Sequence, residues 1–202
     1  MGKKKKETRE WWSFECHDGN VLVADFRNRK GKRIRIFGGG VTRGADIGSV
    51  DLVLNLTGEP DKNIFLNEEA KKKFPELAKV FVSVPMVTID WPDGESPPVP
   101  VETWKRFSEF LQEHNKDMDL LVMCLGGHGR TGTALALILH FLELPQLDGR
   151  DVVEYVRDVY CRKAIETESQ IEYLKKAGIN TKATPSRAET GFSFGKWRYF
   201  EI

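Results

Sequence analysis

The stretch 120-LLVMCLGGHGRTGTALALILHFL-142 joins two apolar runs through a turn that holds a cysteine, three glycines, a histidine and an arginine. The first run is short and continuously apolar, which is typical of a strand buried on both faces. The second run has the length of a helix and is stopped by Pro145. The sequence therefore predicts a strand over 119–125, a glycine-rich turn and a helix over 131–144.

Apolar runs and helical patterns alternate through the rest of the chain. Residues 50–60 and 78–86 indicate two further buried strands, and residues 11–40 break at Asp18-Gly19 and Lys30-Gly31, which favours consecutive hairpins. The other expected helices are 67–74 with Asn67 as N-cap, 101–114, 151–160 and 168–177, the last stopped by Gly178. We therefore predict an α/β fold: a single domain with a central, largely parallel sheet flanked by helices, with extra N-terminal β-hairpins.

The expected organisation has three parts. Residues 1–10 form a basic flexible N-terminus, residues 11–180 form the domain, and residues 181–202 form a tail or an extra strand, two alternatives that the sequence leaves open. A chain of 202 residues can bury a core of its own.

Composition limits the classes of function. Hydrophobic residues make up 40% and charged residues 30% of the chain, and the net charge is +1, so a folded protein is expected and nucleic acid is not favoured as a partner. The three cysteines, Cys16, Cys124 and Cys161, are odd in number and widely spaced, which favours a reducing compartment over a disulfide framework. No apolar run is long enough to span a membrane, and we expect a cytoplasmic protein. The sequence leaves the oligomeric state open.

The turn after the predicted strand has the features of an anion site. Glycines let successive N–H groups point inward, and the following helix N-terminus adds positive potential. Cys124 at the start of the loop would be held as a thiolate nucleophile, and Arg130 at its end offers a two-donor fork for a phosphoryl group. The residues expected to bind the phosphoryl group are Leu125, Gly126, Gly127, His128, Gly129 and Arg130.

Other glycine-rich sites fit the turn less well. No Gly-Lys-Ser/Thr follows, which excludes a Walker loop, and the dinucleotide pattern with its downstream acid is missing. His128 and Cys124 have no paired ligand set around them, so we expect no metal and no cofactor. A buried core cysteine is the remaining alternative.

The segment 124-CLGGHGRT-131 resembles the cysteine-x5-arginine-Ser/Thr signature of the protein tyrosine phosphatase superfamily. Its Gly-Gly-x-Gly-Arg form is most similar to the dual-specificity branch, which includes the cyclin-dependent-kinase-associated phosphatase. The resemblance extends over residues 34–174 and implies hydrolysis of phosphomonoesters through a cysteinyl-phosphate, without metal. It also implies that Thr131 donates a hydrogen bond to the Cys124 thiolate.

Two further segments resemble parts of this machinery. Residues 90-DWPDGESPP-98 are similar to the family's mobile acid loop and select Asp93, 31 residues before Cys124, as general acid in preference to Asp90. Residues 161-CRKAIETESQIEYL-174 are similar to the segment that carries a water-orienting glutamine, here Gln170. Thr167 and Gln170 also fit a capping box, and both roles stay open.

Two loop positions depart from the family pattern. Met123 stands where most members have a histidine, and we expect the backbone N–H groups and Arg130 to maintain activity without it. His128 occupies a position that often carries lysine in lipid-directed members, and it could contact a second phosphate when protonated.

The predicted function is a cysteine-dependent phosphatase acting on a phosphorylated protein, at phosphotyrosine and also at phosphoserine or phosphothreonine. The alternatives are an RNA 5′-triphosphatase, which tends to lack the aspartate acid, a phosphoinositide phosphatase, and a pseudophosphatase that binds phosphate without turnover. Asp93, Cys124 and Arg130 together favour the protein phosphatase.

Overall fold

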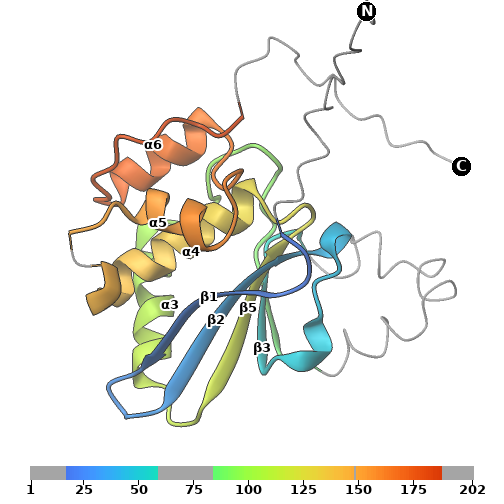
Figure 1. The fold of residues 1–202 in the computed structure, drawn as a ribbon, viewed down its shortest axis with the longest axis vertical. Coiled ribbons are helices and arrows are strands. Elements are labelled where there is room, and N and C mark those ends of the chain that lie inside the picture. The colour runs from blue at the N-terminus through green and yellow to red at the C-terminus, as the bar shows by residue number, and fades with distance from the viewer. Residues whose placement is uncertain (1–16, 59–83, 148, 188–202) are drawn as a thin grey trace, which may run out of the picture.

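The computed structural model describes residues 17–58, 84–147 and 149–187 (Figure 1). The helix predicted over 67–74, any strand before Asp18-Gly19 and the terminal segments 1–16 and 188–202 lie outside these residues.

The described strands form one sheet in the order β1-β2-β5-β3-β4. Their bounds are β1 Val21–Arg27, β2 Arg33–Gly40, β3 Leu52–Asn55, β4 Met86–Thr88 and β5 Met118–Cys124. β1 and β2 form the antiparallel hairpin predicted at Lys30-Gly31, and the pairs β2–β5, β5–β3 and β3–β4 are parallel. The predicted α/β fold with a largely parallel sheet is confirmed, and the hairpin extends this sheet because β2 pairs directly with β5.

Several boundaries differ from the prediction. The strand predicted over 50–60 is described as far as residue 58, and there it is β3, Leu52–Asn55. The strand predicted over 78–86 is described only from residue 84 onward, and there it runs over Met86–Thr88, after Pro85, which has no N–H to donate to a neighbouring strand. The helix predicted over 131–144 is α4, Gly129–Leu142, which begins inside the glycine-rich turn and ends at Glu143 in a left-handed conformation. The turn is therefore shorter than the sequence pattern indicated.

The helices gather around α4 (Figure 1). Besides α4 they are α3 Val101–Glu113, α5 Val152–Val159 and α6 Glu168–Lys176, with short 3-10 turns at Val41–Arg43, Ile47–Ser49 and Pro145–Leu147. α4 contacts β2 and β5 on one side and α3, α5 and α6 on the others, which explains why nearly all its residues are buried. None of the described helices is long and apolar enough to cross a membrane.

Alternate residues of β5 enter two separate clusters. Leu120 and Val122 belong to the main core with the apolar residues of α4, whereas Leu121 and Met123 pack with Ile47 in a smaller cluster. Both faces of β5 are therefore covered, which accounts for its continuous apolar sequence. This packing fixes the end of β5, where Cys124 lies.

Candidate active site

The turn that follows β5 lies at the carboxyl end of the parallel strands. In the β2–β5 register Gly40 lies opposite Cys124, and a Cβ on Gly40 would stand 2.7 Å from the carbonyl carbon of Gly126 and from the nitrogen of Gly127. Gly127 itself has a φ of 75°, which favours glycine. The close approach of two backbone segments thus shapes the loop.

Cys124 is buried at the start of this loop, and its Sγ accepts a hydrogen bond from the N–H of Gly127 at 3.2 Å. An inward N–H group of this kind stabilises negative charge on sulfur. The Thr131 hydroxyl, predicted to donate to the thiolate, instead donates to the carbonyl of Gly39 at 3.3 Å. The cause is local, because Thr131 lies buried in the first turn of α4 against the end of β2.

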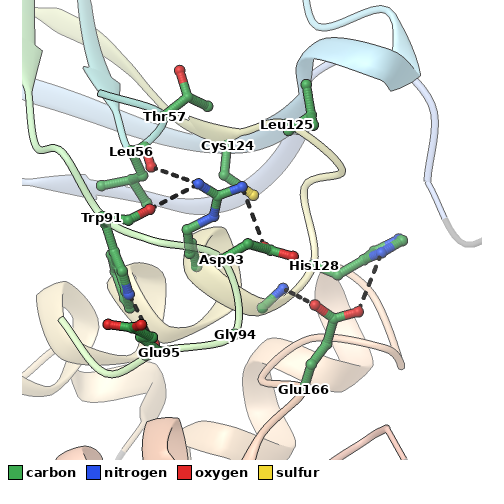
Figure 2. Close-up of polar contacts among 12 residues, drawn as sticks. Leu56, Thr57, Trp91, Asp93, Gly94, Glu95, Cys124, Leu125, His128 and Glu166 are labelled. Atoms are coloured by element: carbon green, nitrogen blue, oxygen red, sulfur yellow. Dashed lines mark hydrogen bonds and ion pairs between the residues drawn. The ribbon is translucent and has the colours of Figure 1, made fainter. Parts of the chain in front are cut away.

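The buried guanidinium of Arg130 connects three segments (Figure 2). Its Nη1 donates to the carbonyls of Leu56 at 3.2 Å and Trp91 at 2.9 Å, and its Nη2 lies 3.2 Å from Oδ1 of Asp93. Its Nε is buried and has no hydrogen-bond partner among the described residues. Backbone carbonyls therefore hold Nη1 of the guanidinium. The edge formed by Nε and Nη2 contacts only the Asp93 carboxylate among the described residues.

Asp93 lies on a loop that is fastened at several points. Trp91 is buried against Trp104 and donates from its ring nitrogen to the carbonyl of Glu95 at 2.8 Å. The carbonyl of Gly94 accepts hydrogen bonds from the hydroxyls of Thr167 and Ser169 on α6 and its cap. The Asp93 side chain is 72% exposed and forms an ion pair with Arg130. A dashed line from Asp93 marks this ion pair in Figure 2.

The neighbouring carboxylate has a different environment. Asp90 Oδ1 would lie 2.8 Å from a Cβ placed on Gly58, so this side chain faces the segment after β3. The structure therefore brings Asp93 to Arg130, in line with the preference for Asp93 over Asp90.

Gln170 forms the predicted capping box with Thr167. Its Oε1 accepts hydrogen bonds from the N–H groups of Glu166 at 2.8 Å and Thr167 at 3.3 Å. Its Nε2 is buried, has no partner among the described residues, and would lie 2.9 Å from a Cβ on Gly129. The amide thus caps α6 with its oxygen and directs its nitrogen toward the phosphate loop, so the two roles are compatible.

Glu166 is a site residue that the sequence did not reveal. Its Oε2 accepts a hydrogen bond from the N–H of Gly129 at 3.1 Å, and its Oε1 lies 3.8 Å from Nδ1 of His128 (Figure 2). Burial raises the pKa of this carboxyl, and the nearby charge of Asp93 raises it further. The only sequence signal was its position beside Thr167 in the segment that resembles the family.

His128 is the residue predicted to contact a second phosphate. Its side chain is 15% exposed, and burial lowers its pKa to about 4, with smaller contributions from His17 and Arg43. The lowered pKa favours a neutral ring at neutral pH in the phosphate-free protein, and the second-phosphate contact stays a prediction. By contrast, Leu125 lies 37% exposed at the rim, and its carbonyl accepts from the N–H and hydroxyl of Thr42, both at 3.0 Å.

Two curated proteins are similar in sequence to this chain. Among curated proteins, the uncharacterised protein MJ0215 of Methanocaldococcus jannaschii is 35% identical over 118 residues, which is 55% of this chain and 69% of the relative. The uncharacterised protein MJECL20 of the same organism is 34% identical over 120 residues, 56% of this chain and 76% of the relative.

Solved structures with low sequence identity are also similar. Tk-PTP in its active form is 21% identical, with a TM-score of 0.48 and coverage of 78% of this chain and 95% of that chain. Kinase-associated phosphatase with its catalytic cysteine replaced by serine is 15% identical, with a TM-score of 0.47 and coverage of 84% and 99%.

A family model matches most of the described chain. Residues 45–186 match the model described as "PTP-SAK: Swiss Army Knife protein, DSP-PTPase phosphatase domain", and this range contains Asp93, the Cys124 loop and Gln170. The match confirms the predicted resemblance to the dual-specificity branch. The chain is therefore a member of the DSP-PTPase phosphatase family of cysteine-based phosphatases.

Proposed function

We propose that this phosphatase hydrolyses phosphotyrosine and phosphoserine or phosphothreonine esters in a protein substrate, with Cys124 as nucleophile. The observation that carries the proposal is the buried Nε and Nη2 edge of Arg130, which among the described residues contacts only Asp93, while Nη1 is held by backbone carbonyls. Two parallel donors match two oxygens of a phosphoryl group. Nucleophile, phosphate clamp and acid therefore meet at one loop.

In the first step the Cys124 sulfur attacks phosphorus and the ester P–O bond breaks. The inward N–H of Gly127 supports the sulfur, and Arg130 neutralises charge on the phosphoryl oxygens. When these oxygens occupy the Arg130 edge, the Asp93 carboxylate leaves its ion pair, takes up a proton from solvent and gives it to the departing ester oxygen. The products are a cysteinyl-phosphate and the free hydroxyl of the substrate.

In the second step a water molecule attacks the cysteinyl-phosphate, and the S–P bond breaks to regenerate the thiolate. The buried Nε2 of Gln170 is placed to hold this water, and Asp93 accepts its proton. Thr131 assists the departing sulfur if its hydroxyl turns from the Gly39 carbonyl toward Cys124. No protein-bound metal takes part in either step.

The exposure of Asp93 supports a substrate whose phosphorylated side chain is either short, as in phosphoserine, or long, as in phosphotyrosine. Asp93 is 72% exposed and Leu125 is 37% exposed, so the leaving oxygen would lie near the protein surface. A phosphoserine or phosphothreonine side chain can reach that depth as well as phosphotyrosine can. A triphosphate substrate would have less need of Asp93, because its leaving phosphate is a weaker base than an alkoxide.

The test compares the wild type with Cys124→Ser and Asp93→Ala on p-nitrophenyl phosphate, phosphotyrosine and phosphothreonine peptides, a phosphoinositide and 5′-triphosphorylated RNA. We expect turnover in EDTA that requires Cys124, with the largest loss in Asp93→Ala on the phosphothreonine peptide, whose leaving group is most basic. Turnover of RNA or phosphoinositide exceeding that of both peptides would contradict the proposed substrate class. Phosphate binding without Cys124-dependent turnover would indicate a pseudophosphatase.

A further inference from the structure

Three side chains of types that can bind a metal meet at the phosphate loop, one of them on the loop itself. The ligand atoms of His17, His128 and Cys161 all lie within 4.8 Å of one another. They come from three segments: the residues before β1, the loop itself and the residue that follows Tyr160 at the end of α5. His17 and Cys161 are buried, and His128 is partly buried.

We propose that His17, His128 and Cys161 form a binding site for a zinc ion, with the fourth ligand position left to water. Two imidazoles and one thiolate are a ligand set that suits Zn²⁺. Bond lengths of about 2.0–2.1 Å to nitrogen and about 2.3 Å to sulfur place tetrahedral ligand atoms about 3.3–3.6 Å apart. Ligand atoms at the 4.8 Å limit would have to approach by about 1.2–1.5 Å to reach this spacing.

Polar groups lie close to both histidines. Glu166 Oε1 lies 3.8 Å from Nδ1 of His128, and the hydroxyl of Tyr160 lies 3.3 Å from Nε2 of His17. Histidines that bind metals usually donate their other ring N–H to a carboxylate or another polar group, and these two groups are close enough to take that part once the rings adjust to a metal. The Tyr160 hydroxyl also donates to the carbonyl of Gly127, which connects the cluster to the loop backbone.

The charges around the cluster set a condition on binding. The cationic side chains of Arg43 and Lys163 act on both imidazoles through space, so they oppose a divalent cation. Cys161 gives up its proton when it binds zinc, and the resulting thiolate together with Glu166 offsets that charge. The Cys161 thiolate is therefore essential to the site.

A zinc ion here would join the phosphate loop to two other segments. His128 lies between Gly127 and Gly129, while His17 precedes β1 and Cys161 follows Tyr160 at the end of α5. Since a ligand that binds only the folded chain stabilises it, zinc should raise the unfolding temperature.

The experiment uses the full chain, treated with EDTA, dialysed and titrated with Co²⁺ as a spectroscopic substitute for Zn²⁺. We expect one equivalent of Co²⁺ to bind, with a thiolate-to-cobalt absorption band and the visible bands of a four-coordinate ion. Cys161→Ser should lose the thiolate band, and His17→Ala should weaken Co²⁺ binding at least tenfold. Cys124→Ser and Cys16→Ser are the matched controls and should keep both signals.

Unfolding temperatures with and without Zn²⁺ give a second measurement. Zinc should raise the value for the wild type and for Cys124→Ser but not for His17→Ala, a variant that also serves if Cys161→Ser does not fold. The proposal is overturned if the thiolate band disappears in Cys124→Ser or Cys16→Ser and persists in Cys161→Ser. It is also overturned if the wild type binds no Co²⁺. None of these measurements depends on catalytic turnover, so they are independent of the proposed phosphatase substrate.

Discussion

Gly40 ends β2 and is 84 residues from Cys124 in sequence, yet the structure predicts that Gly40→Ala will damage the phosphate loop. A Cβ at this position would lie 2.7 Å from the carbonyl carbon of Gly126 and from the nitrogen of Gly127, and 2.8 Å from the Gly126 oxygen. These are backbone atoms, so no side-chain rotation relieves the contact. The φ and ψ of Gly40, −138° and 137°, suit any residue, so space alone requires glycine.

The size of the effect follows from the displacement. Ordinary contact begins at 3.4 Å, so the loop must move by about 0.7 Å. Overpacking of this kind costs about 1–3 kcal/mol, which lowers the unfolding temperature by about 2–12 °C for a chain of this size. A shift approaching 1 Å in a catalytic group can cost about 100-fold in rate. We therefore expect kcat/KM to fall by about 10- to 100-fold.

The assay is p-nitrophenyl phosphate hydrolysis together with thermal unfolding, and Gly126→Ala is the matched control. Among the described residues, a Cβ on Gly126 would approach only Nδ1 of His128, at 3.8 Å, so this variant should unfold within about 2 °C of the wild type. Wild-type kinetics in Gly40→Ala would refute the steric reasoning. Equal damage in both variants would show instead that the loop needs glycine for its conformational freedom.

Three other changes test the site. Asp93→Asn should lower kcat on a phosphothreonine peptide by about 10²- to 10⁴-fold, and a smaller loss than on p-nitrophenyl phosphate would contradict the acid role. Gln170→Ala should destabilise the fold by about 1 kcal/mol, because the capping box is lost. It should also produce a burst of p-nitrophenol, because cysteinyl-phosphate accumulates when the second step is slow. Destabilisation without a burst would leave only the capping role. The pKa of Glu166 is raised in the folded protein above its ordinary value of 4.5, so the folded state binds this proton more tightly than the unfolded state does. The fold therefore loses stability as the pH rises from 4.5 through the raised pKa. Glu166→Gln should therefore unfold at higher urea concentration than the wild type at pH 7.5, and the advantage should shrink at pH 4.

The sequence predicted those parts of the site that depend on short segments. Cys124, the loop glycines and Arg130 lie within one turn, and the apolar runs on either side define the strand and the helix that hold it. The Trp-Pro-Asp segment and the Thr167 capping box are likewise local patterns. Helices and strands could be distinguished from the sequence, because hydrophobic periodicity and helix caps depend on residues that are close together in the chain.

Contacts between distant segments could not be predicted in the same way. Glu166 reaches the N–H of Gly129 only because α6 packs against α4, and His17 reaches the loop only because β1 and β2 join the central sheet. The start of β4 after Pro85 and the hydroxyl of Thr131 on Gly39 also depend on which strands become neighbours. A single sequence contains no direct signal for such pairings.

Arg130 explains how substrate binding and acid release can be one event. Its Nη1 is held by carbonyls that follow β3 and precede Asp93, so the guanidinium is fixed before any phosphate binds. Its Nη2 meanwhile retains Asp93, whose loop is fastened through Gly94 to the start of α6. A dianionic phosphoryl group competes for Nη2 more strongly than a monovalent carboxylate does. In the proposed mechanism, the phosphoryl group that replaces Asp93 on Arg130 is thus the one whose leaving oxygen needs a proton, and the displaced carboxylate takes up that proton before it acts as the acid.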